Sequence, residues 1–301
     1  MGLDRRNPIK AARALIWAGW ATGRARRILR AMRADIVLGG GGYVAAPAGL
    51  AARSLRLPLV LTEADSHLGV ANRVLAPFAA RVFLAFDIPG RAGPRWVVTG
   101  RPIPADVVGA DRAAARARFG IDDDRECLLV FGGSLGARRL NEAAIEAFGS
   151  AAPCWVLHAC GQRDHADLDR RLEELGRPDH YKLHPFITPF GDAYAAADLA
   201  AARAGGSVFE LLAAGLPAVL VPYPHATADH QTGNARWTER GGAAVVVPDD
   251  DLDGPRLARE VGALLGAPDR LHAMQRAALA LARPDAAERV AHEVLTLARK
   301  S

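Results

Sequence analysis

Three glycine-rich turns are the segments of this sequence best suited to bind a charged ligand. They span residues 39–43, 132–136 and 203–207, and each lies between a short apolar run and a helical pattern. Backbone N–H groups in such a turn approach an anion without a Cβ in the way, and the dipole of the following helix assists. Ser134 and Ser207 add hydroxyl donors. Tight packing explains a single turn of this kind, whereas three together predict binding of phosphate groups.

Two common nucleotide motifs do not account for these turns. No Gly-Lys-Ser/Thr follows any of them, so none is a Walker A loop. The turn at 132–136 lacks the third glycine of the dinucleotide-binding fingerprint. A different phosphate-containing ligand is therefore expected.

Glu210 follows the third turn and has two interpretations. With Ser207 three residues earlier, it fits a capping box, in which the carboxylate accepts from the backbone at the start of the helix. Alternatively, its carboxylate accepts hydrogen bonds from two ribose hydroxyls. The sequence leaves both open.

A polar loop at 222–234 follows the next apolar run. It holds His225, Asp229, His230, Gln231 and Asn234, side chains that recognise a hydroxylated ligand. Metal binding by the two histidines is disfavoured, because residues five apart do not share a helix face. No metal site is expected.

Apolar runs that are continuous rather than alternating predict strands buried on both faces, as in parallel sheets. Helical patterns separate most of them, so we expect an α/β fold with two Rossmann-like, doubly wound domains. The expected strands are 35–38, 58–61, 81–85, 96–99, 127–131, 154–159, 181–186, 198–202, 217–221 and 243–247. A break with two prolines near residues 100–111 separates the two domains, and Asp111 is expected to cap the next helix.

Charge and apolar content exclude some classes of protein. The 38 Lys and Arg against 33 Asp and Glu leave a small excess, and no basic stripe carries interleaved aromatic residues, so no nucleic-acid partner is expected. No apolar run is long enough for a transmembrane helix. The first helix instead combines Trp17 and Trp20 with Arg24 and Arg27, a pattern typical of helices that lie on anionic membranes. Packing of this helix on the sheet is the alternative.

The motifs together resemble the MurG family of GT-B glycosyltransferases, glycosyltransferase family 28. The resemblance rests on Gly-Gly-Gly-Gly-Tyr at 39–43, Gly-Gly-Ser-Leu-Gly-Ala at 132–137, Glu-Leu-Leu-Ala-Ala-Gly-Leu-Pro at 210–217, and Asp-His-Gln at 229–231 with Asn-Ala at 234–235. They occur in the family's order. The resemblance implies two domains facing a cleft, with residues 1–104 in an incomplete acceptor- and membrane-facing domain. Residues 105–284 would form the donor domain, and a helix in 285–301 would cross back to the first.

The resemblance also implies the reaction. N-acetylglucosamine passes from UDP-GlcNAc to undecaprenyl-pyrophosphoryl-MurNAc-pentapeptide (lipid I), with inversion, to give lipid II for peptidoglycan synthesis. The enzyme would sit peripherally on the cytoplasmic face of the cell membrane, without a tightly bound metal or other cofactor.

By this resemblance, the turn at 132–136 faces the nucleotide diphosphate, Ile187 lies beside uracil, Glu210 holds the ribose and Gln231 contacts the sugar hydroxyls. The implied donor-binding residues are Asp65, Gly133, Ser134, Gly136, Ile187, Gly205, Gly206, Ser207, Glu210, Gln231 and Asn234. The acceptor pyrophosphate would bind at Gly40, Gly41, Gly42 and Tyr43.

The sequence departs from the family pattern at four places. Thr-Glu-Ala-Asp at 62–65 replaces His-Glu-Gln-Asn, Gly-Arg-Pro-Ile-Pro at 100–104 replaces Gly-Asn-Pro-Val-Arg, and the third glycine turn is one residue short. The family's N-terminal Gly-Gly-Thr-Gly-Gly-His loop, with the histidine proposed as base, does not occur. We therefore expect that this chain is shortened at its N-terminus and that its transferase activity is impaired. Asp65 and His67 are the remaining candidates for the catalytic base.

Two other functions fit the same residues. One is a GT-B UDP-sugar transferase with another acceptor, such as a diacylglycerol or a small secondary metabolite. The other is a nucleotide-sugar-binding fragment that works only with a partner chain.

Overall fold

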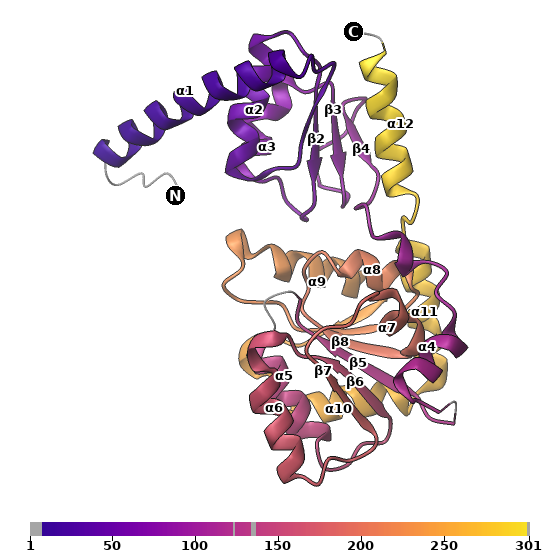
Figure 1. Ribbon diagram of the computed structural model, residues 1–301. Coiled ribbons are helices and arrows are strands. Elements are labelled where there is room, and N and C mark those ends of the chain that lie inside the picture. The colour runs from indigo at the N-terminus through magenta and orange to yellow at the C-terminus, as the bar shows by residue number, and fades with distance from the viewer. Residues whose placement is uncertain (1–7, 123, 134–136, 300–301) are drawn as a thin grey trace. The chain divides into compact units, whose positions relative to one another are not determined.

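The computed structural model describes residues 8–122, 124–133 and 137–299, and the chain divides into two compact units (Figure 1). Unit 1 comprises Met1–Arg101 together with Asp285–Ser301, and unit 2 comprises Pro102–Pro284. Each unit has its own parallel sheet, of four strands in unit 1 and six in unit 2.

Unit 1 is built on a sheet with the strand order β1-β2-β3-β4. Its elements are α1 (Pro8–Ala31), β1 (Val37–Gly39), α2 (Gly42–Ser54), β2 (Leu59–Glu63), α3 (Val70–Leu75), η1 (Ala76–Phe78), β3 (Arg81–Leu84), β4 (Trp96–Val98) and α12 (Ala286–Ala298).

The two faces of this sheet are covered by different parts of the chain. Because side chains alternate along a strand, Leu59 and Leu61 of β2 pack with Leu75 of α3 in one cluster. Val60 points the other way and packs with Phe83 and with Val290 of α12. The last helix therefore completes the first unit.

Unit 2 contains the larger sheet. Its elements are η2 (Ala105–Val107), α4 (Arg112–Phe119), β5 (Cys127–Phe131), α5 (Arg138–Phe148), β6 (Trp155–Ala159), α6 (Gln162–Glu174), β7 (Tyr181–His184), α7 (Gly191–Ala196), β8 (Leu199–Ala202), α8 (Val208–Ala213), β9 (Ala218–Leu220), η3 (Thr227–Asp229), α9 (His230–Arg240), β10 (Ala244–Val246), η4 (Asp249–Asp251), α10 (Gly254–Leu265) and α11 (Pro268–Leu281).

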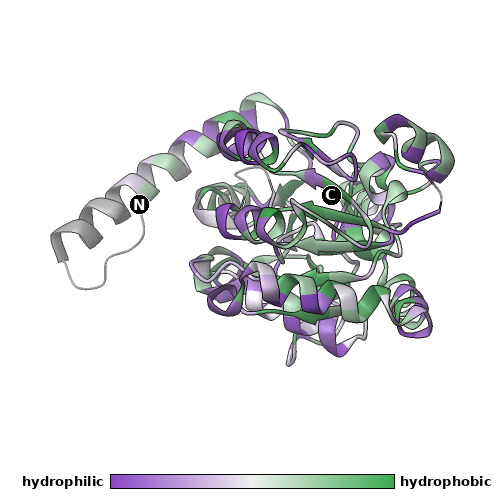
Figure 2. Cartoon of the chain, turned by 90° about the horizontal axis from the view of Figure 1, so that it is seen from below, coloured by the Kyte–Doolittle hydropathy of each residue, from purple (hydrophilic) through white to green (hydrophobic). Residues whose placement is uncertain are grey.

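The strand order of unit 2 is β10-β9-β8-β5-β6-β7. Starting at β5, the chain adds β6 and β7 on one side, then returns to place β8, β9 and β10 on the other. Leu129 packs into the cluster on one face of the sheet and Leu128 into the cluster on the other. Figure 2 shows hydrophobic residues concentrated along the strands. Strands buried on both faces explain the continuous apolar runs in the sequence.

The structure confirms the predicted α/β class and all ten expected strands. It also confirms the expected helix start at Asp111, whose carboxylate accepts from the Ala114 N–H at 2.7 Å. In the described part of the chain, no helix is long and apolar enough to span a membrane.

Candidate functional site

The strand order of unit 2 creates a crevice at the carboxyl edge of its sheet. Connections leave β5 and β8 in opposite directions, and in open α/β sheets ligands bind beside such a switch point. The second and third glycine turns follow these two strands, so the topology brings together segments about 70 residues apart.

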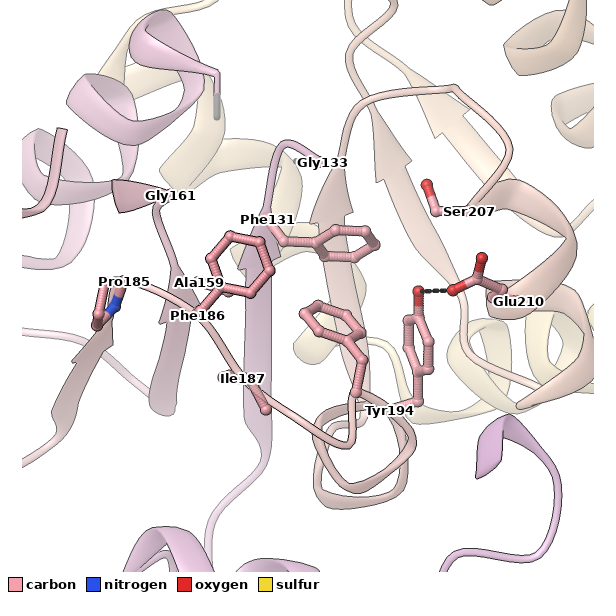
Figure 3. Close-up of a pocket in the computed structure, with 11 residues that line it drawn as sticks. Phe131, Gly133, Ala159, Gly161, Pro185, Phe186, Ile187, Tyr194, Ser207 and Glu210 are labelled. Atoms are coloured by element: carbon pink, nitrogen blue, oxygen red, sulfur yellow. Dashed lines mark hydrogen bonds between the residues drawn. The ribbon is translucent and has the colours of Figure 1, made fainter. Parts of the chain in front are cut away.

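A pocket of about 230 Å³ occupies this edge (Figure 3). Its lining residues come from the ends of β5, β6 and β7, from α7 and the residue before it, and from the start of α8: Phe131, Gly133, Ala159, Gly161, Pro185, Phe186, Ile187, Phe190, Tyr194, Ser207 and Glu210. The expected donor residues Gly133, Ile187, Ser207 and Glu210 thus line one pocket. Ser134 and Gly136 lie outside the described residues.

The walls of the pocket are largely aromatic. Phe131, Phe190 and Tyr194 meet edge to face, with ring centroids 5.0–5.9 Å apart. Ile187 is buried beside them. An apolar slot with aromatic walls can accommodate a planar ring such as a nucleobase. Of the segment 185–190, only Ile187 was predicted as part of the site. Phe186 and Phe190 were not predicted, although one phenylalanine at the end of an expected strand and another four residues later were their signal.

Glu210 and Ser207 form the polar side of the pocket. The Tyr194 hydroxyl donates to Glu210 Oε2 at 2.9 Å, whereas the Ser207 side chain makes no capping hydrogen bond to α8. The capping-box interpretation of these two residues is therefore wrong. Burial, together with the adjacent carboxylate, raises the pKa of Tyr194 far above its usual value, so this hydroxyl stays protonated.

Buried polar side chains stabilise the third glycine turn, residues 203–207, through hydrogen bonds on the side away from the pocket. Asn234 of α9 is 1% exposed and its Nδ2 donates to the Ala204 carbonyl at 3.2 Å. Arg203 donates to the Val221 carbonyl and forms an ion pair with Asp249. Asn234, expected to bind the donor, thus lies behind the turn, and the pocket lining does not include it.

Gln231 lies beside the same turn. Its Oε1 accepts from the Tyr223 N–H at 2.9 Å, and a Cβ on Gly205 would lie 3.8 Å from its Nε2. The backbone thus fixes which end of the amide faces Gly205, and the Nε2 group can donate to a ligand. Gly206 lies partly exposed in this turn.

A buried network lies behind the pocket, between β6 and the helices α5 and α6. Asn141 Nδ2 donates to the Cys160 carbonyl at 2.9 Å and to Asp164 Oδ2 at 3.0 Å, and its Oδ1 faces His158 Nε2 at 3.0 Å. His158 Nδ1 in turn lies 2.8 Å from the Tyr181 hydroxyl. Burial lowers the pKa of His158 to about 3, so the ring is neutral.

Unit 1 carries a second group of expected site residues. Gly41 and Gly42, with φ of 81° and 69°, turn the chain from β1 into α2, a geometry that favours glycine. Tyr43 is 80% exposed and Gly40 is also exposed. A Cβ on Gly41 would lie 3.4 Å from Asn72 Nδ2, so this turn adjoins α3, the helix that follows the loop 64–69.

Glu63 organises that loop. Its Oε1 accepts from the Asp65 N–H at 3.3 Å, and its Oε2 accepts from the Gly69 N–H at 2.8 Å and from Asn72 Nδ2 at 3.0 Å. Asp65 and His67, the candidates for the base, lie half-buried in the loop. In the sequence, Glu63 was noted only as part of the Thr-Glu-Ala-Asp motif at 62–65. Its role in holding the loop was not predicted.

Helix α1 presents aromatic and basic side chains on its surface. Trp17 and Trp20 are 60% and 59% exposed, and their rings meet edge to face at 5.9 Å. The Arg24 guanidinium lies 5.6 Å from the centre of the Trp20 ring, and Arg27 is exposed. The described residues contain no group of three or more side chains suited to hold a metal ion.

Two family models match this chain. Residues 2–84 match the glycosyltransferase family 28 N-terminal domain, and residues 127–290 match the family 28 C-terminal domain. The chain belongs to glycosyltransferase family 28. The family predicted from the glycine turns is therefore confirmed.

Curated relatives in this family share much of the sequence. A protein of Moorella thermoacetica is 40% identical over 98% of this chain and 82% of its own length, and one of Salinibacter ruber is 43% identical over 90% and 74%. Both are named UDP-N-acetylglucosamine–N-acetylmuramyl-(pentapeptide) pyrophosphoryl-undecaprenol N-acetylglucosamine transferase.

Solved structures give the same result for the fold. The crystal structure of Acinetobacter baumannii MurG matches with a TM-score of 0.76 at 32% identity, over 91% of this chain and 77% of that one. A UDP-GlcNAc 2-epimerase of Neisseria meningitidis matches with a TM-score of 0.65 at 13% identity, which shows the fold alone. The predicted GT-B class is confirmed, and this family 28 chain is of the MurG type.

Proposed function

We propose that this chain transfers N-acetylglucosamine from UDP-GlcNAc to the 4-hydroxyl of lipid I, forming lipid II with inversion at the sugar. The identity of about 40% to relatives named for this reaction carries the proposal. The pocket of unit 2 supports it, because it joins an aromatic slot to a carboxylate.

The donor would bind in unit 2. Uracil would enter the apolar slot beside Ile187, and Glu210 would accept from the ribose hydroxyls. The N–H groups of the turn containing Gly133, with the N-terminus of α5, would face the diphosphate and stabilise the charge that develops as UDP departs. Gln231 Nε2 and the 205–207 turn would face the sugar. Asn234 would act by holding that turn.

The acceptor would bind in unit 1. Gly40, Gly41, Gly42 and Tyr43 would receive its pyrophosphate, where the chain turns into α2. Attack by the acceptor hydroxyl requires removal of its proton, and Asp65 and His67 are the candidates on the adjoining loop.

Helix α1 would hold the enzyme at the anionic cytoplasmic surface of the membrane, where a lipid-linked acceptor resides. Its exposed tryptophans suit the interfacial region, and each arginine near an anionic surface contributes about 1 kcal/mol. Such binding would bring the acceptor site of unit 1 within reach of its substrate.

The decisive experiment supplies purified chain with radiolabelled UDP-GlcNAc and lipid I in anionic vesicles. We expect labelled lipid II, and its loss in Glu210→Ala. Diacylglycerol in the same vesicles, without lipid I, is the control acceptor. Transfer to diacylglycerol but not to lipid I would contradict the proposed acceptor, and failure to bind UDP would contradict the donor site.

A further inference from the structure

Tyr194 has a role in the pocket that neither the motifs nor the family name assigns. It begins the last turn of α7, is 2% exposed, and lines the pocket beside Phe131 and Phe190. Its ring contributes to the aromatic wall, but its hydroxyl reaches beyond the wall to Glu210 (Figure 3). If this residue served only as part of the aromatic wall, a phenylalanine would suffice and the hydroxyl would not be needed.

The hydrogen bond constrains the Glu210 carboxylate. Tyr194 Oη donates to Glu210 Oε2 at 2.9 Å, and among the described residues no other hydrogen bond to this carboxylate is found. A carboxylate has about four lone-pair sites, so most of its acceptor capacity remains for a ligand. Glu210 is only half-buried and lines the pocket, so the remaining sites are within reach of one.

We propose that Tyr194 is a positioning residue that orients the Glu210 carboxylate toward the ribose hydroxyls and so makes the site selective for ribonucleotide over deoxyribonucleotide donors. The inference rests on the proposed donor site in unit 2.

Two physical arguments support this role. A glutamate side chain has three rotatable bonds, and fixing one oxygen before the ligand arrives lowers the entropy cost of binding. The buried tyrosine also keeps its proton, so it always donates, and the carboxylate is always the acceptor. A carboxylate held in this way can accept hydrogen bonds from both hydroxyls of a ribose. A deoxyribose lacks the 2′-hydroxyl and therefore donates one hydrogen bond fewer.

The test compares binding of UDP and 2′-deoxyUDP by calorimetry, using the full chain. We expect wild type to prefer UDP by tenfold or more, since one hydrogen bond to a charged group contributes about 1.5–3 kcal/mol. In Tyr194→Phe, which keeps the aromatic wall, the preference should fall to within about threefold, mainly through weaker UDP binding.

Tyr181→Phe is the matched control. It removes another buried tyrosine hydroxyl in unit 2, one bonded to His158 and outside the pocket lining. It should lower thermal stability to a similar extent while leaving the preference for UDP unchanged. Equal loss of preference in both variants would reduce the role of Tyr194 to general packing, and overturn the inference.

The remaining outcomes are also decisive. A Tyr194→Phe protein that binds UDP and keeps the wild-type preference overturns the inference alone. A wild-type protein that binds neither nucleotide overturns the proposed donor site, and the inference with it.

Discussion

The two units hold their candidate site residues in contrasting ways. In unit 2, the pocket wall includes the buried side chains of Phe131, Ile187 and Tyr194, and buried Asn234 and Arg203 support the third glycine turn. In unit 1, the glycine turn ends in an exposed Tyr43, and the loop with Asp65 and His67 depends on one carboxylate, Glu63. A preformed pocket suits a small soluble ligand, whereas an open surface suits a ligand that remains largely in a membrane.

The largest expected effect lies in the pocket of unit 2. Glu210→Ala removes the acceptor for the ribose and leaves the buried Tyr194 hydroxyl without its partner, so kcat/KM for UDP-GlcNAc should fall about 10²–10³-fold. Steady-state kinetics at saturating lipid I measures this. A fall below fivefold would show that the pocket does not hold the ribose.

A smaller effect is expected on the surface of α1. Trp17→Ala, Trp20→Ala, Arg24→Glu and Arg27→Glu together should weaken binding to anionic vesicles about tenfold to a hundredfold, because apolar contact and charge attraction are both lost. Co-sedimentation measures the binding, and the affinity for UDP in solution is the internal control. Unchanged co-sedimentation would contradict a role of α1 in membrane binding and would favour packing on the sheet as its only role.

Glu63→Gln tests whether one carboxylate organises the site of unit 1. The substitution places an amide N–H₂ among the Gly69 and Asn72 donors, so the loop should loosen and kcat should fall about tenfold. The affinity for UDP should not change, because Glu63 belongs to the other unit. An altered UDP affinity with normal kcat would contradict the division of labour between the units.

The smallest effect concerns stability. Val290→Ala removes two methyl groups from the contact of α12 with the sheet of unit 1, which should cost about 1–2 kcal/mol. Hydrogen exchange should show faster opening of β2 and β3 but unchanged protection of β5. Uniformly faster exchange in both sheets would show that the units do not unfold separately.

Much of the fold was predictable because the strands are buried on both faces. Continuous apolar runs located all ten strands, and glycines marked the turns where phosphate groups are expected. The order of the strands within each sheet could not be predicted, because apolar runs say nothing about which neighbours pair. The pocket depends on that order, since β8 must return to the side of β5 to place Glu210 opposite Phe131.

The same limit applies to individual side chains. Glu210 fitted a capping box as well as a ribose site. The structure excludes the capping box, because Ser207 makes no capping hydrogen bond and the Glu210 carboxylate instead accepts from Tyr194, 16 positions away. Asn234 belonged to a polar loop, yet it is buried behind a turn that it supports. Such partnerships are tertiary, so residue type and spacing did not show them.

The return of α12 to the sheet of unit 1 has a consequence for how the protein is made. Unit 2 is an insertion within unit 1, and all of its residues leave the ribosome before Ala286–Ala298 emerges. Domains generally fold as units during synthesis. The six-stranded sheet can therefore complete its core while Val60 and Phe83 still await Val290. Unit 1 is therefore the first unit to be synthesised and the last to complete its fold. Until α12 emerges, the sheet face with Val60 and Phe83 is the apolar surface that a chaperone would bind.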